Sequence, residues 1–209
     1  PTSLAEKINA TWAHIFEELM EVNLSDSGNE DQLLRAHWLA VYDYNSQNWQ
    51  QSRTIKERFA LQKYIGKHAE LLNQLLSYLD TLKNAATAYC DMHNPSRPNG
   101  FNDITSTETR KQIIYWSVKL ARLGARASFQ PLLIAVRLRG AKDGASYLET
   151  VRLCELFDFR VYVWMKKQSR AGQTQLFRLG YNYYHNENMQ VLLNGIKDTL
   201  SSYCPGDEF

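Results

Sequence analysis

Residues 67–92 read KHAELLNQLLSYLDTLKNAATAYCDM and contain neither glycine nor proline. Apolar side chains recur in this stretch every three or four residues, which is the spacing of one face of an α-helix. That face is lined by Leu71, Leu75, Tyr78, Leu82 and Ala85. The spacing predicts one long helix. The whole chain holds only ten glycines and five prolines, so few turns are forced and long helices are favoured over a many-stranded sheet.

Helical spacing continues on both sides of this stretch. The expected helices span about residues 4–24, 31–44, 54–64, 105–124, 130–138, 147–167, 174–184 and 188–203. Turn-rich segments separate them, and the strongest is NPSRPNG at 94–100. No segment alternates as a hairpin does, and only residues 159–165 have a β-like composition. We therefore predict an all-α fold, a bundle of eight or nine helices in one continuous domain or in two sub-bundles.

Several helix ends carry recognisable signals. Ser3 and Glu6 have the spacing of a capping box, and so do Thr54 and Glu57. Gly124 is expected to end a helix. The segment SDSGN at 25–29 is expected to separate the first two helices. The stretch 147–167 is apolar on nearly every side, which is typical of a helix buried at the centre of a bundle.

Charge is unevenly distributed, although the formal net charge is only +2. Residues 1–103 hold nine Lys/Arg and thirteen Asp/Glu, residues 104–180 hold fourteen and five, and residues 181–209 hold one and four. The middle block therefore carries a net charge of +9, between blocks of −4 and −3. We place the boundary between an acidic sub-bundle (1–103) and a basic-then-acidic one (104–209) just past the turn-rich segment.

Two interpretations of the basic block remain open. Clustered Lys and Arg side chains can bind the phosphate backbone of nucleic acid, or they dock on the acidic block and face solvent. Lys166, Lys167 and Arg170 also stand at a helix end and the loop after it, where cations complement the helix dipole without a ligand. The candidate nucleic-acid-binding residues are Arg137, Arg139, Lys166, Lys167, Arg170 and Arg178.

Membrane and secretory signals are absent from the sequence. No stretch reaches the roughly 18–20 consecutive apolar residues of a membrane-spanning helix, and the N-terminus lacks the hydrophobic part of a signal peptide. Cys90, Cys154 and Cys204 are odd in number and widely spaced, which favours unpaired thiols in a reducing, cytoplasmic setting. The chain begins at Pro1 without an initiator methionine, and we expect it to be a segment of a longer protein.

None of the common catalytic motifs occurs. Gly66 and Lys67 are followed by a histidine and do not complete a phosphate-binding loop, and neither a dinucleotide-binding glycine motif nor a serine nucleophile elbow is present. No histidine has a carboxylate three residues before it, which excludes a di-iron bundle. Cys90 and His93 form half of a zinc-like spacing without a second pair. We expect no catalytic residue, metal or cofactor in this chain.

Three polar residues fall within apolar helical segments. His37 is expected to be a hydrogen-bonded, partly buried histidine rather than a catalytic base. Asp158 and Arg160 lie in the apolar stretch 147–167, and buried charges need partners. We expect a structural clamp in which Arg160 pairs with Asp158, with Glu155 or with a carboxylate of another helix. A contact to phosphate or to a neighbouring domain is the alternative.

Several strings, taken in order, are similar to a known family. They are LLRAHWL (33–39), SRTIKERF (52–59), YCD (89–91), RLG (122–124), FQPLL (129–133), FDFRVY (157–162), SRAG (169–172) and LFRLGY (176–181). Their order and spacing resemble the helical middle region of GmrSD-type proteins, the modification-dependent (type IV) restriction endonucleases, a family that includes domains of unknown function. The resemblance covers about residues 4–184.

The resemblance implies a place for this chain between two catalytic modules. In that family a ParB-like nucleotide-hydrolysing domain with an Asp-Gly-Gln-Gln-Arg motif stands on the N-terminal side and an HNH nuclease domain on the C-terminal side, and neither pattern occurs here. We therefore expect a non-catalytic scaffold that couples the two in a phage-defence protein and offers a surface to DNA. The full-length protein would be an NTP-dependent DNA endonuclease. The alternative is a helical protein–protein interaction module without nucleic-acid contact.

Overall fold

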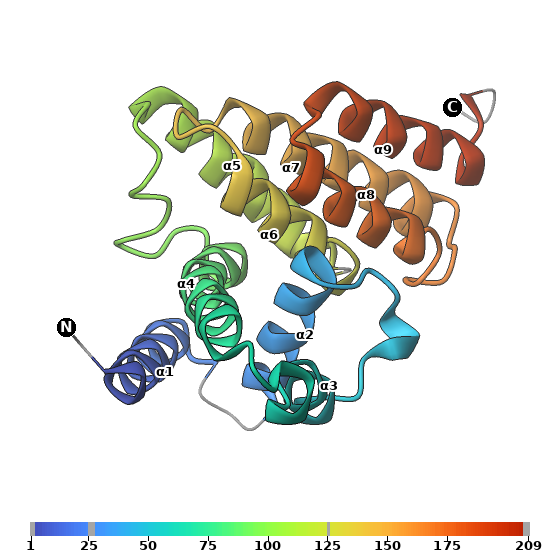
Figure 1. The fold of residues 1–209 in the computed structure, drawn as a ribbon. Coiled ribbons are helices and arrows are strands. Elements are labelled where there is room, and N and C mark those ends of the chain that lie inside the picture. Colours follow the sequence, from blue (N-terminus) through green and yellow to red (C-terminus); the bar gives the residue numbers. More distant parts are fainter. Residues whose placement is uncertain (1–2, 25–27, 125, 207–209) are drawn as a thin grey trace.

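A computed structural model describes residues 3–24, 28–124 and 126–206. This part of the chain contains nine α-helices and no strand, and 75% of the structure is helical (Figure 1). The helices are α1 (Leu4–Glu21), α2 (Asn29–Val41), α3 (Ser52–Arg58), α4 (His68–His93), α5 (Thr107–Leu123), α6 (Gln130–Arg139), α7 (Ala145–Phe157), α8 (Gln173–Asn186) and α9 (Met189–Tyr203). The predicted all-α bundle of eight or nine helices is confirmed.

Shorter elements connect the α-helices. Three are 3₁₀ segments, Ser46–Asn48, Leu61–Tyr64 and Arg126–Ser128, and one is a π-helix, η4 (Asp158–Trp164). The helix expected at 54–64 is divided between α3 and the second 3₁₀ segment. Of the expected break at 25–29, residues 25–27 lie outside the described residues. No helix in the described part of the chain is both long and apolar enough to cross a membrane.

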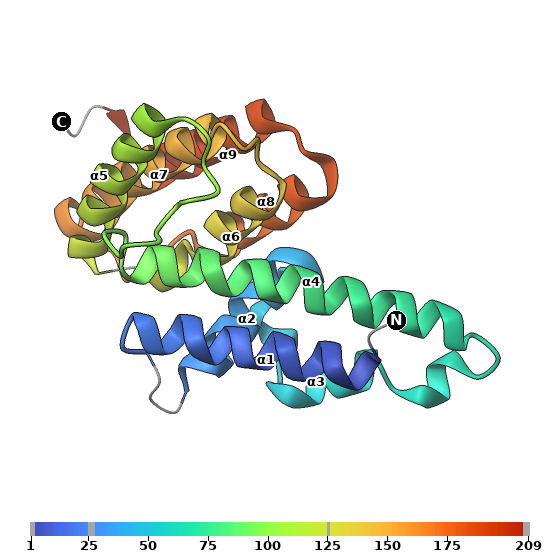
Figure 2. The ribbon, with the colours of Figure 1, turned by 90° about the vertical axis from the view of Figure 1, so that its left-hand side faces the viewer.

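The helices form two stacked groups (Figure 2). One group holds α1 to α4 and the other α5 to α9, and the N-terminal half of α4 extends beyond the second group. Helix α6 packs against α2 and α4 of the first group and against α7 and α8 of its own group. Buried apolar side chains form one core that extends from Ile15 to Cys204. The acidic and basic blocks of the sequence therefore share a single core.

Capping signals locate two helix ends correctly and one wrongly. Ser3 Oγ accepts from Glu6 N at 3.2 Å and Glu6 Oε2 accepts from Ser3 N at 2.7 Å, so the first capping box is confirmed. Gly124 follows α5 in the left-handed region with a φ of 99°, a conformation that favours glycine. The box predicted at Thr54 is wrong because α3 begins two residues earlier; Thr54 Oγ1 accepts instead from Gln50 N at 2.7 Å.

The apolar stretch 147–167 is not one continuous buried helix. After α7 the chain widens into the π-helix η4, whose backbone bonds connect residues five apart. The prediction of a central buried helix is wrong for the second part of this segment, because three of its apolar side chains are about half exposed: Phe159 (40%), Val163 (46%) and Trp164 (56%). The β-like composition of residues 159–165 thus belongs to a helical surface.

Gly180 allows the backbones of α6 and α8 to touch. A methyl group at Gly180 would stand 2.7 Å from Cα of Leu132 on α6, closer than carbon atoms pack. Leu176 and Phe177, one turn earlier on α8, are 0% exposed. This contact fixes α8 and the loop before it on the core.

Candidate functional site

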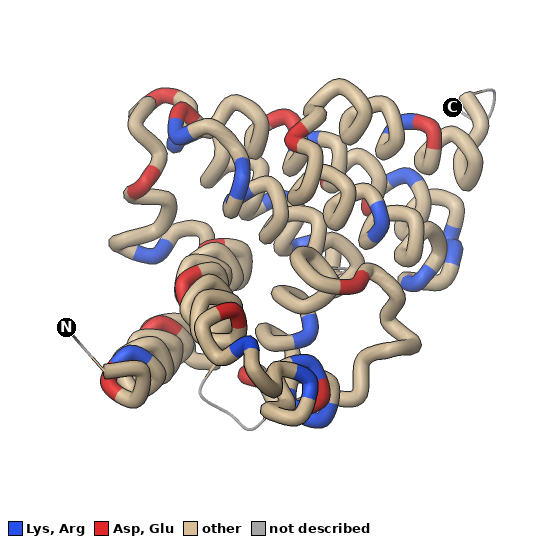
Figure 3. Tube along the Cα trace, in the orientation of Figure 1, with Lys and Arg blue, Asp and Glu red and all other residues tan. Residues whose placement is uncertain are grey.

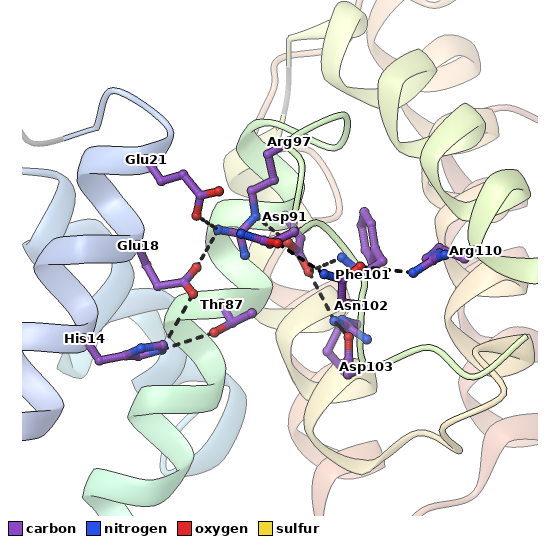
Figure 4. A network of polar contacts seen from close by, with 12 residues as sticks. His14, Glu18, Glu21, Thr87, Asp91, Arg97, Phe101, Asn102, Asp103 and Arg110 are labelled. Carbon is purple, nitrogen blue, oxygen red and sulfur yellow. Dashed lines mark hydrogen bonds and ion pairs between the residues drawn. The ribbon is translucent and has the colours of Figure 1, made fainter. Parts of the chain in front are cut away.

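A buried carboxylate, Asp91 near the C-terminal end of α4, is the centre of a polar network (Figure 4). Its side chain is 0% exposed. Arg97 donates from Nε to Oδ1 at 2.7 Å, and Oδ2 accepts from Phe101 N and from Arg137 Nη2, each at 3.2 Å. A buried carboxylate that is paired and hydrogen-bonded through both oxygens avoids much of the cost of an isolated buried charge.

Arg97 extends the network to α1. Its Nη1 donates to Glu18 Oε2 at 2.6 Å and to Glu21 Oε2 at 2.9 Å, and its side chain is only 1% exposed. Burial alone would lower the pKa of Arg97, but the carboxylates of Asp91 and Glu18 outweigh burial and raise the pKa above its ordinary value. The guanidinium is therefore permanently charged, and it joins α1 to α4 through the loop that leads to α5.

Arg137 of α6 closes the network on its other side. Its Nη2 also donates to Asp103 Oδ1, and its guanidinium carbon lies 5.2 and 5.5 Å from the ring centres of Phe101 and Tyr147. The sequence placed Arg137 on a nucleic-acid surface, and the structure corrects this: the side chain is only 6% exposed. Its guanidinium is already paired with the buried carboxylate of Asp91 and with Asp103, whose side chain is 59% exposed.

A cleft of about 420 Å³ lies beside the network. Its polar lining residues are Asn84, Thr87, Asp103, Arg137, Lys142 and Tyr147. A catalytic site needs a nucleophile or base that is free to act, whereas Asp103 and Arg137 are bonded to each other. Burial raises the pKa of Tyr147, so its hydroxyl stays protonated. Two of the polar lining groups are therefore already paired with each other within the chain.

Cys90 and His93, which form the half zinc motif, lie near the C-terminal end of α4. Burial raises the pKa of Cys90 to about 12, so the thiol is protonated near pH 7. The His93 ring centre lies 4.4 Å from that of Tyr89, and His93 Nε2 lies 3.0 Å from Nε2 of Gln130. Within residues 3–24, 28–124 and 126–206, no group of three or more His, Cys, Asp or Glu side chains could hold a metal ion. All three cysteines are buried and free.

His37 of α2 is completely buried, more so than its sequence context predicts. Its Nε2 lies 2.9 Å from Thr81 Oγ1, which in turn lies 3.0 Å from Ser77 O. If Thr81 donates to that carbonyl, Nε2 carries the imidazole proton. Nδ1 has no hydrogen-bond partner among the described residues. Burial lowers the pKa of His37 to about 3, so the ring is neutral near pH 7 and forms part of the core.

Four of the predicted basic residues lie on the surface, and we call them the basic cluster: Lys166, Lys167, Arg170 and Arg178. The first three occupy the loop between η4 and α8, and Arg178 lies on α8. None of the four forms an ion pair with a carboxylate in the described part of the chain. Figure 3 shows Lys and Arg positions around this loop, at the right of the view, and α8 itself carries one such residue, Arg178.

Arg139, another candidate nucleic-acid-binding residue, is partly engaged by other groups of the chain. Its Nε donates to Tyr184 O at 3.0 Å and its Nη1 lies 3.4 Å from Glu187 Oε1, with 42% of the side chain exposed. The guanidinium also covers the Tyr184 ring. Arg139 therefore joins α6 to the end of α8, and we do not count it in the basic cluster.

The clamp expected at Asp158 and Arg160 stays a prediction. Asp158 is completely buried at the first position of η4, and Arg160 is half-buried two residues later. Oε1 of Glu155, one of the partners considered for Arg160, lies 3.6 Å from Lys119 Nζ.

The buried network of Asp91 and Arg97 was missed by sequence reasoning. A signal was present, because Asp91 is the single carboxylate in the nearly apolar run AATAYCDM at 85–92. The argument applied to Asp158, that a charge within an apolar helix needs a partner, applies equally to Asp91. Arg97 gives no such signal, since an arginine in a turn-rich segment is ordinarily exposed.

Comparison of the chain with models of known protein families, with curated proteins and with solved structures gave no significant match.

Proposed function

We propose that this chain is a non-catalytic helical scaffold of a GmrSD-like restriction protein and that its basic cluster contacts the phosphate backbone of nucleic acid. The observation that carries the proposal is the exposure of four cations without described carboxylate partners. Arg97 and Arg137, by contrast, are neutralised within the fold. Exposed cations that no internal carboxylate neutralises are free to replace the counterions of a polyanion.

The helix dipole does not account for the whole cluster. Lys166 and Lys167 follow η4, where cations complement the negative end of a helix. Arg170 instead lies three residues before α8 begins, near the positive end of that helix, and Arg178 lies in its second turn. These two arginines gain nothing from a helix dipole. The charge of Arg170 adds to that of the α8 N-terminus, which favours phosphate at this position.

Two features support the scaffold part of the proposal. The helices share one core, and the Asp91 network ties α1, α4 and α6 together through buried charges. A rigid helical body of this kind suits a connection between a ParB-like nucleotide-hydrolysing domain and an HNH nuclease domain, as the sequence resemblance implies. Nucleotide hydrolysis and DNA cleavage would then belong to those domains of the full-length protein.

The second candidate is a helical protein–protein interaction module without nucleic-acid contact. The observation that favours it lies on α1, where Phe16 and Met20 are 46% and 62% exposed. Both follow Trp12 at four-residue spacing, so they form an apolar ridge on one side of the helix. Exposed apolar ridges of this kind are often covered by a partner.

Fluorescence anisotropy of a labelled DNA duplex of arbitrary sequence tests the proposal. The wild-type chain is expected to bind weakly at low salt, since only a few phosphates are contacted. The triple variant Lys166→Glu/Lys167→Glu/Arg170→Glu is expected to weaken binding by roughly tenfold or more, because each reversed charge replaces attraction by repulsion.

A matched control makes three charge reversals on the other group of helices, α1 to α4. Lys56, Lys63 and Lys67 are also exposed, and their replacement by glutamate alters the net charge equally. This control is expected to retain most of the wild-type affinity. Equal losses in the two variants, or no duplex binding by the wild type at low salt, would contradict the proposal and favour the protein-interaction module.

A further inference from the structure

The π-helix η4 presents apolar side chains directly before the basic cluster. Phe159, Val163 and Trp164 are 40%, 46% and 56% exposed, although residues of these types are ordinarily buried. Lys166 follows two residues after the end of η4. From residue 159 to residue 186 the sequence contains no aspartate or glutamate. The surface is therefore apolar and cationic, without a carboxylate of its own segment.

The π-helical geometry places the two exposed aromatic residues, Phe159 and Trp164, on one side of η4. In an α-helix, residues five apart point in clearly different directions. In a π-helix each turn closes with a bond between residues five apart, and Met165 N donates in this way to Arg160 O at 2.9 Å. Phe159 and Trp164 are related by the same interval, so η4 brings both to one side of the helix.

The loop of the basic cluster is folded back onto η4. Tyr162 Oη donates to Ala171 O at 2.7 Å, and Lys167 N donates to Val161 O at 3.0 Å. Gly172, with a φ of +74°, lets the chain pass close to Phe157, since a methyl group there would stand 2.9 Å from Cζ of that ring. These contacts hold the backbone of the loop that carries Lys166, Lys167 and Arg170 against η4 and the end of α7.

We propose that Phe159 and Trp164 stack with unpaired bases while the basic cluster contacts the adjoining phosphates, so that this surface binds single-stranded nucleic acid in preference to duplex. The inference rests on the proposed function, because it assumes that the basic cluster meets phosphate. Aromatic side chains beside a basic surface are the usual means of binding a single strand without sequence preference. In a duplex the base faces are covered by their neighbours, so only the phosphates remain accessible.

The chemistry of the surface favours nucleic acid over an acidic peptide. Exposed cations alone would accept either polyanion. The two aromatic rings favour a partner that has flat rings of its own. Nucleic-acid bases are flat, so they can stack on Phe159 and Trp164 and also interact with neighbouring arginines. An acidic peptide has carboxylates but needs no flat partner surface. Competition between the two polyanions is therefore informative.

Anisotropy measurements with a labelled single-stranded oligothymidylate of about 20 nucleotides, and with a duplex of the same length, test the inference. The double variant Phe159→Ala/Trp164→Ala is expected to lose roughly tenfold in affinity for the single strand and to bind the duplex as the wild type does. The single variant Trp164→Phe, made with Phe159 unchanged, keeps an aromatic ring at both positions. It is expected to retain most of the wild-type affinity for the single strand. Phe16→Ala, at an exposed aromatic residue on α1, is the control and is expected to bind both ligands normally.

The outcomes separate this inference from the proposed function. If the wild type binds neither ligand, both proposals fail. If the charge-reversal variant loses binding but Phe159→Ala/Trp164→Ala binds the single strand as the wild type does, only the stacking inference is overturned. Displacement of the oligonucleotide by polyglutamate at equal charge concentration would also overturn it. Far-UV circular dichroism and the unfolding midpoint of each variant show whether a loss of binding reflects unfolding.

Discussion

The guanidinium of Arg97 and the carboxylate of Asp91 meet at 2.7 Å, with 1% and 0% of the two side chains exposed. Arg97 lies in the turn-rich segment and Asp91 in the last turns of α4, so this pair fixes the path of the chain between the two groups of helices. The same guanidinium reaches Glu18 and Glu21 on α1. The junction of the acidic and basic blocks is thus held by a buried ion network.

Removing one member of this network is expected to destabilise the whole protein. Arg97→Ala would leave the Asp91 carboxylate buried with half of its charge compensation lost. Breaking a buried ion pair in this way costs about 3–5 kcal/mol of the free energy of unfolding. Urea denaturation followed by circular dichroism measures the difference from the wild type.

Arg53→Ala is the matched control for Arg97→Ala. Arg53 Nε also bonds to a carboxylate, Glu57 Oε1 at 2.7 Å, but both side chains are more than half exposed. Exposed pairs of this kind contribute only about 0.3–0.5 kcal/mol. If Arg97→Ala lowered the free energy of unfolding no more than Arg53→Ala does, the buried network would not hold the fold together.

Stability is expected to fall as the pH is lowered, because of His37. Its pKa is about 3 in the folded protein, where burial disfavours the charged ring, against 6.5 in the unfolded chain. Between these values the unfolded state binds a proton that the folded state does not. The contribution of the neutral, buried His37 ring to the free energy of unfolding is therefore fully present above pH 6.5 and is lost as the pH falls toward 3. Between about pH 7 and pH 5 the loss is roughly 2 kcal/mol.

The dependence can be assigned to His37 by substitution. His37→Gln removes the titrating group, so the variant is expected to be less stable at neutral pH but to show a shallower decline on acidification. His68→Gln, at the exposed first residue of α4, is expected to decline as steeply as the wild type. Parallel stability curves for wild type and His37→Gln would show that His37 is not the group responsible.

Two glycine substitutions test the packing of α8 against its neighbours. Gly180→Ala would press a methyl group against backbone atoms of Leu132, which cannot move without shifting α6. Overpacking of this kind costs about 1–3 kcal/mol. Gly195→Ala in α9 meets only the end of the Leu179 side chain, which can rotate away, and the alanine improves helix propensity by up to about 1 kcal/mol.

Thermal unfolding of the two variants gives the comparison directly. Gly180→Ala is expected to unfold at a clearly lower temperature than the wild type, and Gly195→Ala at nearly the same temperature. Equal unfolding temperatures for Gly180→Ala and the wild type would mean that α6 and α8 are not held as closely as described.

Most of the helices could be predicted from local sequence, because apolar spacing and capping residues act over a few positions. The long α4 and the cap at Ser3 are examples. The π-helix η4 could not be predicted, since contacts from the following loop, such as that of Tyr162 with Ala171, contribute to it. A helical period read from residue types does not contain that information.

The candidate site was predictable only in part, for a related reason. A basic surface follows from composition, and the exposed Lys166 and Lys167 lie where it was expected. The burial of Arg137 depends on Asp103 and Asp91, which stand 34 and 46 residues before it in the sequence. Pairing across such distances is decided by the packing of α4 against α6, which sequence spacing alone does not show.

The salt dependence of duplex binding tests most directly whether the basic cluster contacts the phosphate backbone. Four contacts predict that the logarithm of the binding constant falls with the logarithm of salt concentration with a slope of about −3 to −4. The affinity should then fall roughly 100-fold between about 50 and 200 mM salt, and Arg178→Ala should reduce the slope by about 1. A slope near zero, or one unchanged when the basic cluster is replaced by alanine, would contradict the account.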